Sequence, residues 1–112
     1  MAYDRDLADR VREALSGRSV REVSMFGGLT FMVNGKMAVT ANTQGDLMVR
    51  CDPSRVESLL TRDGAGWPVM RGRKMSKGWI VVEAGHIESD KVLSSWIREA
   101  LDYNEKVTDS GS

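Results

Sequence analysis

The first stretch of regular hydrophobic spacing predicts a helix near the start of the chain. Leu7, Val11, Ala14 and Leu15 recur at intervals that place them on one helical face. The acidic residues before them suit the positive end of a helix dipole. We therefore predict an amphipathic helix over about residues 4–16.

The spacing then changes to strict alternation, which is typical of strands. Apolar positions alternate with polar ones over residues 23–25 and 29–33. The dipeptide Asn34-Gly35 favours the positive φ angles of a two-residue turn, so a hairpin follows with its second strand at 36–42. A looser turn leads to a fourth strand at 47–51.

Two later stretches return to helical spacing. Asp52-Pro53 is typical of a helix start and precedes a short apolar stripe at residues 56–60. Ser89 can cap a last helix, whose buried face we expect to hold Leu93, Trp96, Ile97, Ala100 and Leu101. Between these helices we predict two strands, at residues 67–70 and 79–83, joined by a basic turn at 71–78.

The predicted order is α-β-β-β-β-α-β-β-α. Strands linked by tight turns imply an antiparallel sheet, and three helices most simply cover one face of it. The fold class we expect is a two-layer α+β fold in one domain. We place this domain at residues 1–105 and expect a disordered tail at 106–112.

The hairpin register predicts which side chains share a face. A two-residue loop pairs Val33 with Lys36, which places Leu29, Phe31, Val33, Ala38 and Thr40 on one face and Thr30, Met32, Met37, Val39 and Ala41 on the other. Both faces are largely apolar, whereas a sheet with one wet face alternates more cleanly. Either loops cover the second face or another chain does. The candidate dimer or partner face consists of Leu29, Phe31, Val33, Met32, Met37 and Val39.

Composition excludes several classes of protein. Sixteen basic and sixteen acidic residues cancel, so no overall field points to nucleic acid or an anionic membrane. One cysteine allows no internal disulfide, and the charged N-terminus is unlike a secretory signal. The longest apolar run, at residues 79–82, is too short to cross a bilayer. We expect a cytoplasmic protein.

The residues that usually carry catalysis are sparse. His86 is the only histidine and lies in a predicted turn, whereas Cys51, the only cysteine, falls on an apolar face. No spacing is typical of a nucleophile with its base, of a metal site or of a phosphate-binding loop. We expect no enzyme, no catalytic residue, no metal and no cofactor.

Charge is unevenly distributed along the second half of the chain. Residues 50–77 hold seven basic and three acidic side chains, and residues 83–105 hold two basic and six acidic ones. Basic side chains beside aromatic ones can contact phosphates and stack on bases. The candidates for nucleic-acid or partner binding are Arg71, Arg73, Lys74, Lys77, Trp67 and Trp79. Two alternatives are a solvated hairpin tip and pairing of the two segments with each other, within one chain or across a dimer.

A family resemblance rests on the segment Met25-Phe26-Gly27-Gly28 followed by the Asn34-Gly35 turn. This segment resembles the N-terminal domain of TfoX/Sxy proteins, bacterial regulators of DNA competence. Residues 3–15 and 47–50 resemble the opening helix and fourth strand of that family, and residues 72–75 with Gly78-Trp79 resemble its late signature. The resemblance covers about residues 3–103.

The resemblance implies a fold similar to secretion-chaperone-like domains, which often dimerise through the sheet. It also implies regulation without catalysis, and a structural role for the motif residues Met25, Phe26, Gly27 and Gly28. The chain ends where the second domain of the family would begin, so we expect a standalone domain that serves another pathway.

We therefore predict a non-enzymatic regulatory protein-interaction module, linked to transcription or competence regulation. Its expected partner is a second copy of itself, another regulatory protein, or both. Binding of nucleic acid through the basic turn is the alternative.

Overall fold

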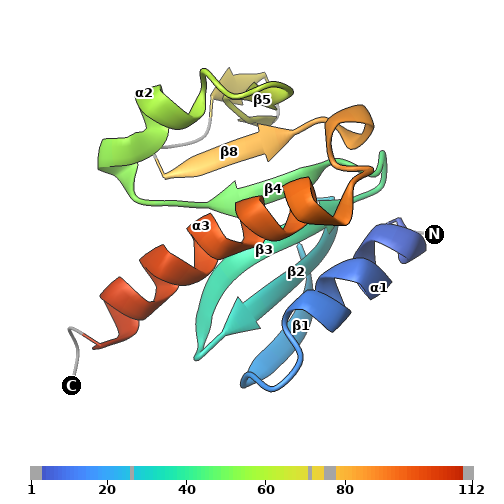
Figure 1. Cartoon of the computed structure of the whole chain (residues 1–112), viewed down its shortest axis with the longest axis vertical. Helices are drawn as coiled ribbons and strands as arrows, with labels where there is room; N and C mark the ends of the chain where they lie inside the picture. Colours follow the sequence, from blue (N-terminus) through green and yellow to red (C-terminus); the bar gives the residue numbers. More distant parts are fainter. Residues whose placement is uncertain (1–3, 26, 71, 75–77, 110–112) are drawn as a thin grey trace.

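A single antiparallel sheet organises the computed structural model, which describes residues 4–25, 27–70, 72–74 and 78–109 (Figure 1). Within these residues the α-helices and strands are α1 (Arg5–Ala14), β1 (Val20–Met25), β2 (Gly28–Val33), β3 (Lys36–Asn42), β4 (Leu47–Arg50), α2 (Val56–Leu59), β5 (Ala65–Gly66), β6 (Val69–Met70), β7 (Arg73–Lys74), β8 (Trp79–Val82) and α3 (Asp90–Asp109). Short 3-10 turns precede α2, at Pro53–Arg55, and α3, at Ala84–His86.

The six strands of the main sheet follow the order β1-β2-β3-β4-β8-β5, and every neighbouring pair is antiparallel. Strands β6 and β7 form a separate two-stranded ribbon. Residues of α1, α2 and α3 join one core cluster with the strands, so the helices lie on one face of the sheet. The predicted two-layer α+β fold is confirmed.

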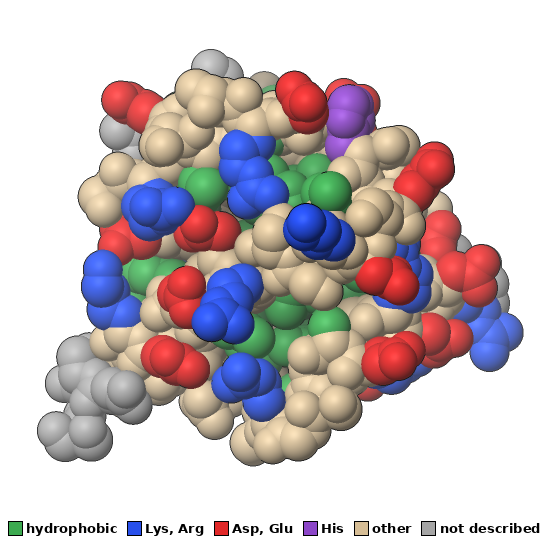
Figure 2. Space-filling model, viewed as in Figure 1, with side chains coloured by type: hydrophobic (Ala, Val, Ile, Leu, Met, Phe, Trp, Pro, Cys, Tyr) green, Lys and Arg blue, Asp and Glu red, His purple; other side chains and the backbone are tan. Residues whose placement is uncertain are grey.

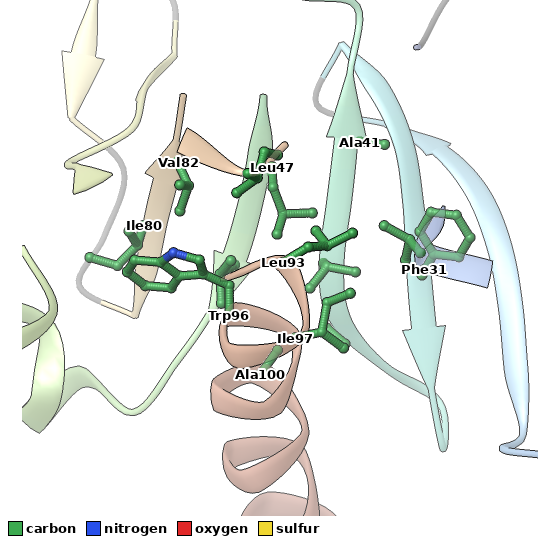
Figure 3. Close-up of a cluster of buried hydrophobic side chains, with 14 of the residues drawn as sticks. Phe31, Ala41, Leu47, Ile80, Val82, Leu93, Trp96, Ile97 and Ala100 are labelled. Carbon is green, nitrogen blue, oxygen red and sulfur yellow. The ribbon is translucent and has the colours of Figure 1, made fainter. Parts of the chain in front are cut away.

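The helix-facing core is built around α3. Trp96, Ile97 and Ala100 lie on the face of the helix that points to the sheet, where they meet buried residues of β8 and β4 such as Ile80 and Leu47 (Figure 3). Their spacing of three and four residues keeps them on one helical stripe. This is the packing that the sequence pattern predicted for the last helix.

Helix α1 begins where its sequence predicts. The Asp4 side chain accepts a hydrogen bond from the Leu7 backbone N–H at 2.9 Å, which satisfies one of the free donors of the first turn. Leu7, Val11 and Leu15 are buried against the sheet and α3. The helix is therefore held by a cap at one end and by its apolar stripe along its length.

The hairpin of β2 and β3 contains a bulge that the sequence did not reveal. Val33 pairs with Lys36 as predicted, but the register shifts so that Phe31 pairs with Val39. The extra residue lets Ala38 and Val39 both face the helices, where each is buried in the core. Our assignment of the two hairpin faces was therefore wrong beyond the bulge.

The corrected faces differ in chemistry. Leu29, Phe31, Val33, Val39 and Ala41 belong to the helix side, and Thr30, Met32, Met37 and Thr40 to the opposite side. We predicted that both faces of the hairpin are largely apolar. In the structure one face is apolar, and the other mixes threonine with methionine.

Helix α3 continues to Asp109, past Asn104, where the apolar pattern ends. Asn104 is buried, and its Nδ2 donates a hydrogen bond to the Val33 backbone carbonyl at 2.8 Å. Its Oδ1 accepts a hydrogen bond from the side-chain Nδ2 of Asn34 at 3.3 Å. A polar side chain thus takes the place of an apolar one and ties the helix to the β2–β3 turn. The helical residues 106–109 fall within the tail that we expected to be disordered.

The region before β8 is also divided differently from our expectation. The predicted strand at 67–70 is replaced by β5 at Ala65–Gly66 and β6 at Val69–Met70, and the basic turn contains β7. Such two-residue ladders are set by pairing with a neighbour, because they are too short to show a period of their own.

In the described parts of the chain, no helix combines the length and apolar character that a membrane crossing needs.

The β1–β2 turn explains two glycines of the family motif. Gly27 has a φ of +68°, which an L side chain rarely adopts. Gly28 lies so close to β3 that a Cβ atom would stand 2.3 Å from the Ala41 carbonyl oxygen.

We therefore expect Gly28→Ala to lower the free energy of unfolding by about 2 kcal/mol or more, because strand backbones would have to separate. Chemical denaturation measures this loss. Gly85→Ala is the matched control: its Cβ would meet no atom within 4 Å, so we expect a change within about 0.5 kcal/mol. Equal losses in the two variants would contradict the close approach.

Candidate partner-binding face of the sheet

The candidate surface is the face of the sheet opposite the helices, which we call the far face. Register places Val23, Thr30, Thr40, Met48 and Val81 in one row across five neighbouring strands. Met48 is buried but lies outside the core cluster that the helices join. Burial on the far face therefore comes from strands and connecting segments.

Two threonines occupy the centre of the far face. Thr30 and Thr40 are directly paired, are fully buried, and join their hydroxyl groups at 2.6 Å. Each hydroxyl is thus satisfied by the other. The buried pair therefore leaves no hydroxyl group without a partner, which is the usual cost of burying hydroxyls.

Methionines surround the threonine pair. Met25, Met32 and Met37 are half-buried, and Met48 is 4% exposed. Methionine is unbranched and polarizable, so it adapts to surfaces of different shape. The methionines therefore give the far face a soft, apolar area beside the exposed Arg21.

A groove of about 370 Å³ lies at one end of the far face. Met48 and Val81 contribute to its lining, together with Gly27, Asn42, Thr43, Gln44, Asp46, Pro68 and Val69. Val69 is 60% exposed, which sets it apart from the other large apolar side chains of the described residues. The groove can accept an apolar side chain beside Val69.

The structure separates the six residues that we predicted for a partner face. Leu29, Phe31, Val33 and Val39 are buried beneath the helices and are unavailable to a partner. Only Met32 and Met37 lie on the far face. The bulge accounts for the position of Val39, since it turns that side chain toward α3.

The predicted nucleic-acid residues are only partly described. Arg71 and Lys77 lie outside the described residues, and Arg73 and Lys74 are described by their backbone in β7. Trp67 is half-buried. Trp79 is buried, with the Arg50 guanidinium 5.9 Å from its ring centre, so its face is not open to a base. Nucleic-acid binding stays a prediction.

The two oppositely charged segments meet within the chain. Arg55 of the basic segment binds Glu99 of the acidic segment at 2.6 Å. Beside this pair, Lys106, which follows the acidic segment, binds Asp52 at 2.7 Å. Hydrogen bonds from Lys106 and from Ser54 hold the pKa of Asp52 well below its usual range. In agreement, Figure 2 shows Lys and Arg interspersed with Asp and Glu over the helix side, with no large area of one sign.

His86 and Cys51 are not brought into a catalytic arrangement. His86 is exposed, and its ring packs over Gly64, where a Cβ would stand 2.5 Å from it. Cys51 is buried in the core, and burial, aided by nearby Glu99 and Asp52, raises its thiol pKa to about 11. No cluster of three His, Cys, Asp or Glu side chains in the described residues is suited to a metal ion.

Sequence reasoning missed the threonine pair and Val69. A correct register would have placed Thr30 opposite Thr40, but the bulge has no signature in the alternation of residues 36–42. Val69 was assigned to a strand, whereas its exposure depends on how the β6–β7 ribbon meets the main sheet.

The threonine pair makes a testable prediction about stability. Thr30→Val and Thr40→Val should each cost about 1–3 kcal/mol of unfolding free energy, because each leaves the other hydroxyl buried without a partner. The double variant should recover most of that loss, since no unpaired hydroxyl remains. A double-mutant cycle by urea denaturation measures the coupling, and strictly additive losses would contradict the hydrogen bond.

The Cys51 thiol gives a prediction on pH. Its pKa is raised from 9.0 to about 11, so folded and unfolded chains are both neutral at this position below pH 9. As pH rises from 9 through 11 the unfolded thiol ionises first, and stability falls. We expect the wild type to lose roughly 1–2 kcal/mol more than Cys51→Ala between pH 8.5 and 10.5.

Denaturation at both pH values measures this difference, and the lysine and tyrosine groups shared by the two proteins cancel in the comparison. Ellman's reagent at pH 8 serves as an independent check, because the buried thiol should react only after unfolding. Equal losses in both proteins, or rapid labelling of the native chain, would place Cys51 at the surface.

Comparison with known proteins assigns the chain to a family. The family model described as the TfoX N-terminal domain matches residues 11–103, which is most of the chain, so the protein belongs to this family. The family is linked to the regulation of competence. No curated protein and no solved structure matches the chain.

Proposed function

We propose that this member of the TfoX N-terminal domain family is a non-enzymatic regulatory module that binds another protein through the far face of its sheet. The observation that carries the proposal is the contrast between the two faces. The helix side is closed by α1, α2 and α3, whereas half-buried methionines lie on the far face with no helix of the described chain above them.

The chemistry of the far face suits a protein partner. Thr30 and Thr40 are already buried in the free chain and satisfy each other, so a partner that binds the surrounding surface leaves both hydroxyl groups paired. Met32 and Met37 can adapt to the partner surface, and the groove beside Val69 offers a pocket for one apolar side chain. Apolar patches of this kind often mark interfaces.

The regulatory part of the proposal comes from the family. Membership links the chain to competence regulation, and a regulator can act by contact alone. The described residues bring together no nucleophile, base and orienting group, which supports binding in place of catalysis.

The test compares one exposed substitution on each side of the sheet. Val69→Lys adds a charge at the rim of the far-face groove, and Ser94→Lys adds the same charge on the exposed side of α3. Neither position is in the core, so both variants should fold. Tagged wild type and variants are used to capture proteins from the cells of origin, and the captured partner is then purified and titrated.

We expect a partner that wild type and Ser94→Lys retain equally and that Val69→Lys binds at least tenfold more weakly. Met37→Lys, on the same face, should weaken binding in the same direction. Equal affinity for all variants would exclude the far face. Binding of DNA at low salt, lost as salt rises, with no protein captured would favour the nucleic-acid alternative.

A further inference from the structure

The two edges of the sheet differ in how they are protected. Strand β5 at one edge has two residues, whereas β1 at the other has six and pairs with β2 without a register shift (Figure 1). β1 contains no proline and no bulge. Short strands, prolines, bulges and charged side chains are the usual means of keeping an edge from pairing with another strand. Of these, β1 has two adjacent charges, Arg21 and Glu22, and the Glu22 carboxylate is held by Arg12 on the helix side.

The backbone groups at this edge can be identified from the register. Met25 and Gly28 close a two-residue turn, so they exchange both hydrogen bonds, and alternate residues of β1 repeat that pattern. The Ser19 carbonyl accepts from the Asn34 N–H at 3.1 Å, which fixes the same alternation at the other end.

The N–H and C=O groups of Val20, Glu22 and Ser24 consequently point away from the sheet. None of these groups has a partner among the described residues. Another β-strand is the partner that supplies donors and acceptors at the matching spacing.

We propose that β1 pairs antiparallel with β1 of a second copy of this chain, so that two sheets join edge to edge about a two-fold axis. An axis perpendicular to the sheet keeps each face on the same side in both copies and pairs residues in a self-complementary way. The outward groups of one copy then meet the outward groups of the other.

Charge selects the register. An axis at Glu22 would set two glutamates directly opposite each other, and an axis at Arg21 would do the same for two arginines, both of which are destabilising. An axis at Val23 and one at Ser24 both avoid these clashes, but an axis at Ser24 pairs only residues 23–25 within β1, whereas an axis at Val23 pairs residues 21–25. It pairs Val23 with the partner's Val23, Arg21 with the partner's Met25, and Glu22 with the partner's Ser24.

The Val23 register also places compatible side chains together. Val23 is half-buried on the far face, and in a pair without direct hydrogen bonds its Cα atom would lie about 4.5 Å from the partner's Cα. The carboxylate of Glu22 is already held by Arg12 at 2.7 Å, on the helix side, so it does not obstruct the edge. The two far faces become continuous in the dimer, which leaves the proposed partner surface accessible.

The first experiment measures mass by sedimentation equilibrium over a range of concentrations of the full chain. We expect a reversible dimer of twice the 12.4 kDa chain mass. Val23→Lys should weaken dimerisation at least tenfold, because two lysines would face each other. Val23→Thr, which keeps a β-branched strand former, should leave the dimer unchanged. Circular dichroism checks that each variant is folded.

The second experiment tests the register by disulfide cross-linking. Val23→Cys should form an intermolecular disulfide under mild oxidation, since the expected Cα separation is within disulfide range. Arg21→Cys, on the same strand and face, should not cross-link with itself but should cross-link with Met25→Cys of a mixed sample. Cys51 is buried and does not compete.

A chain that stays monomeric at all concentrations would overturn the proposal, as would a dimer that Val23→Lys leaves intact. Equal cross-linking of Val23→Cys and Arg21→Cys would overturn the register. These outcomes are independent of the proposed function, because Val69→Lys tests the far face and leaves the β1 edge untouched.

Discussion

The extra residue in β3 determines which side chains the sheet presents to each of its faces. Because Ala38 and Val39 both turn toward α3, every apolar residue of the second hairpin strand beyond the bulge supports the helix side. Thr40 is thereby placed opposite Thr30. A continuous register would instead have buried Thr40 beneath the helices, where its hydroxyl would face an apolar layer, and left Val39 on the open face.

Electrostatic contacts reinforce the attachment of α3 without creating a strong external field. Arg10 of α1 forms an ion pair with Asp90 at the start of α3. Arg55, which precedes α2, forms another with Glu99 in the middle of α3. Exposed pairs of this kind contribute little stability each. Their combined effect is to place basic side chains of neighbouring elements against an acidic helix, so the uneven charge of the second half of the chain is balanced by contacts within the fold.

The sequence was most informative where backbone conformation depends on a single residue type. Asn34 and Gly35 both adopt positive φ angles, as their turn requires, and Asp4 caps the helix that its position predicted. These features are local, so one sequence is enough to recognise them.

Features that depend on contacts between distant segments were not predictable in this way. The bulge at Ala38 is defined by the pairing of β3 with β2, and the buried Asn104 finds its partner in the Val33 carbonyl, 71 residues away in the sequence. Four of the six residues that we predicted for a partner face are accordingly buried in the core, and only Met32 and Met37 lie on the far face. Strand edges are similar: that β1 is an edge follows from the sheet order, and no residue within β1 encodes it.

The role proposed for the far face requires a surface that stays soluble in the free chain and yet loses water readily when a partner covers it, and its composition is compatible with both demands. A wholly aliphatic face would bind partners strongly but would also promote aggregation. A polar face would resist covering, because each buried group would need a new hydrogen bond. The Thr30–Thr40 pair is polar in composition but internally satisfied, and the methionines around it offer apolar contact without a fixed shape. This composition is the reason for proposing shallow, adaptable contact with a protein in place of tight enclosure of a small molecule.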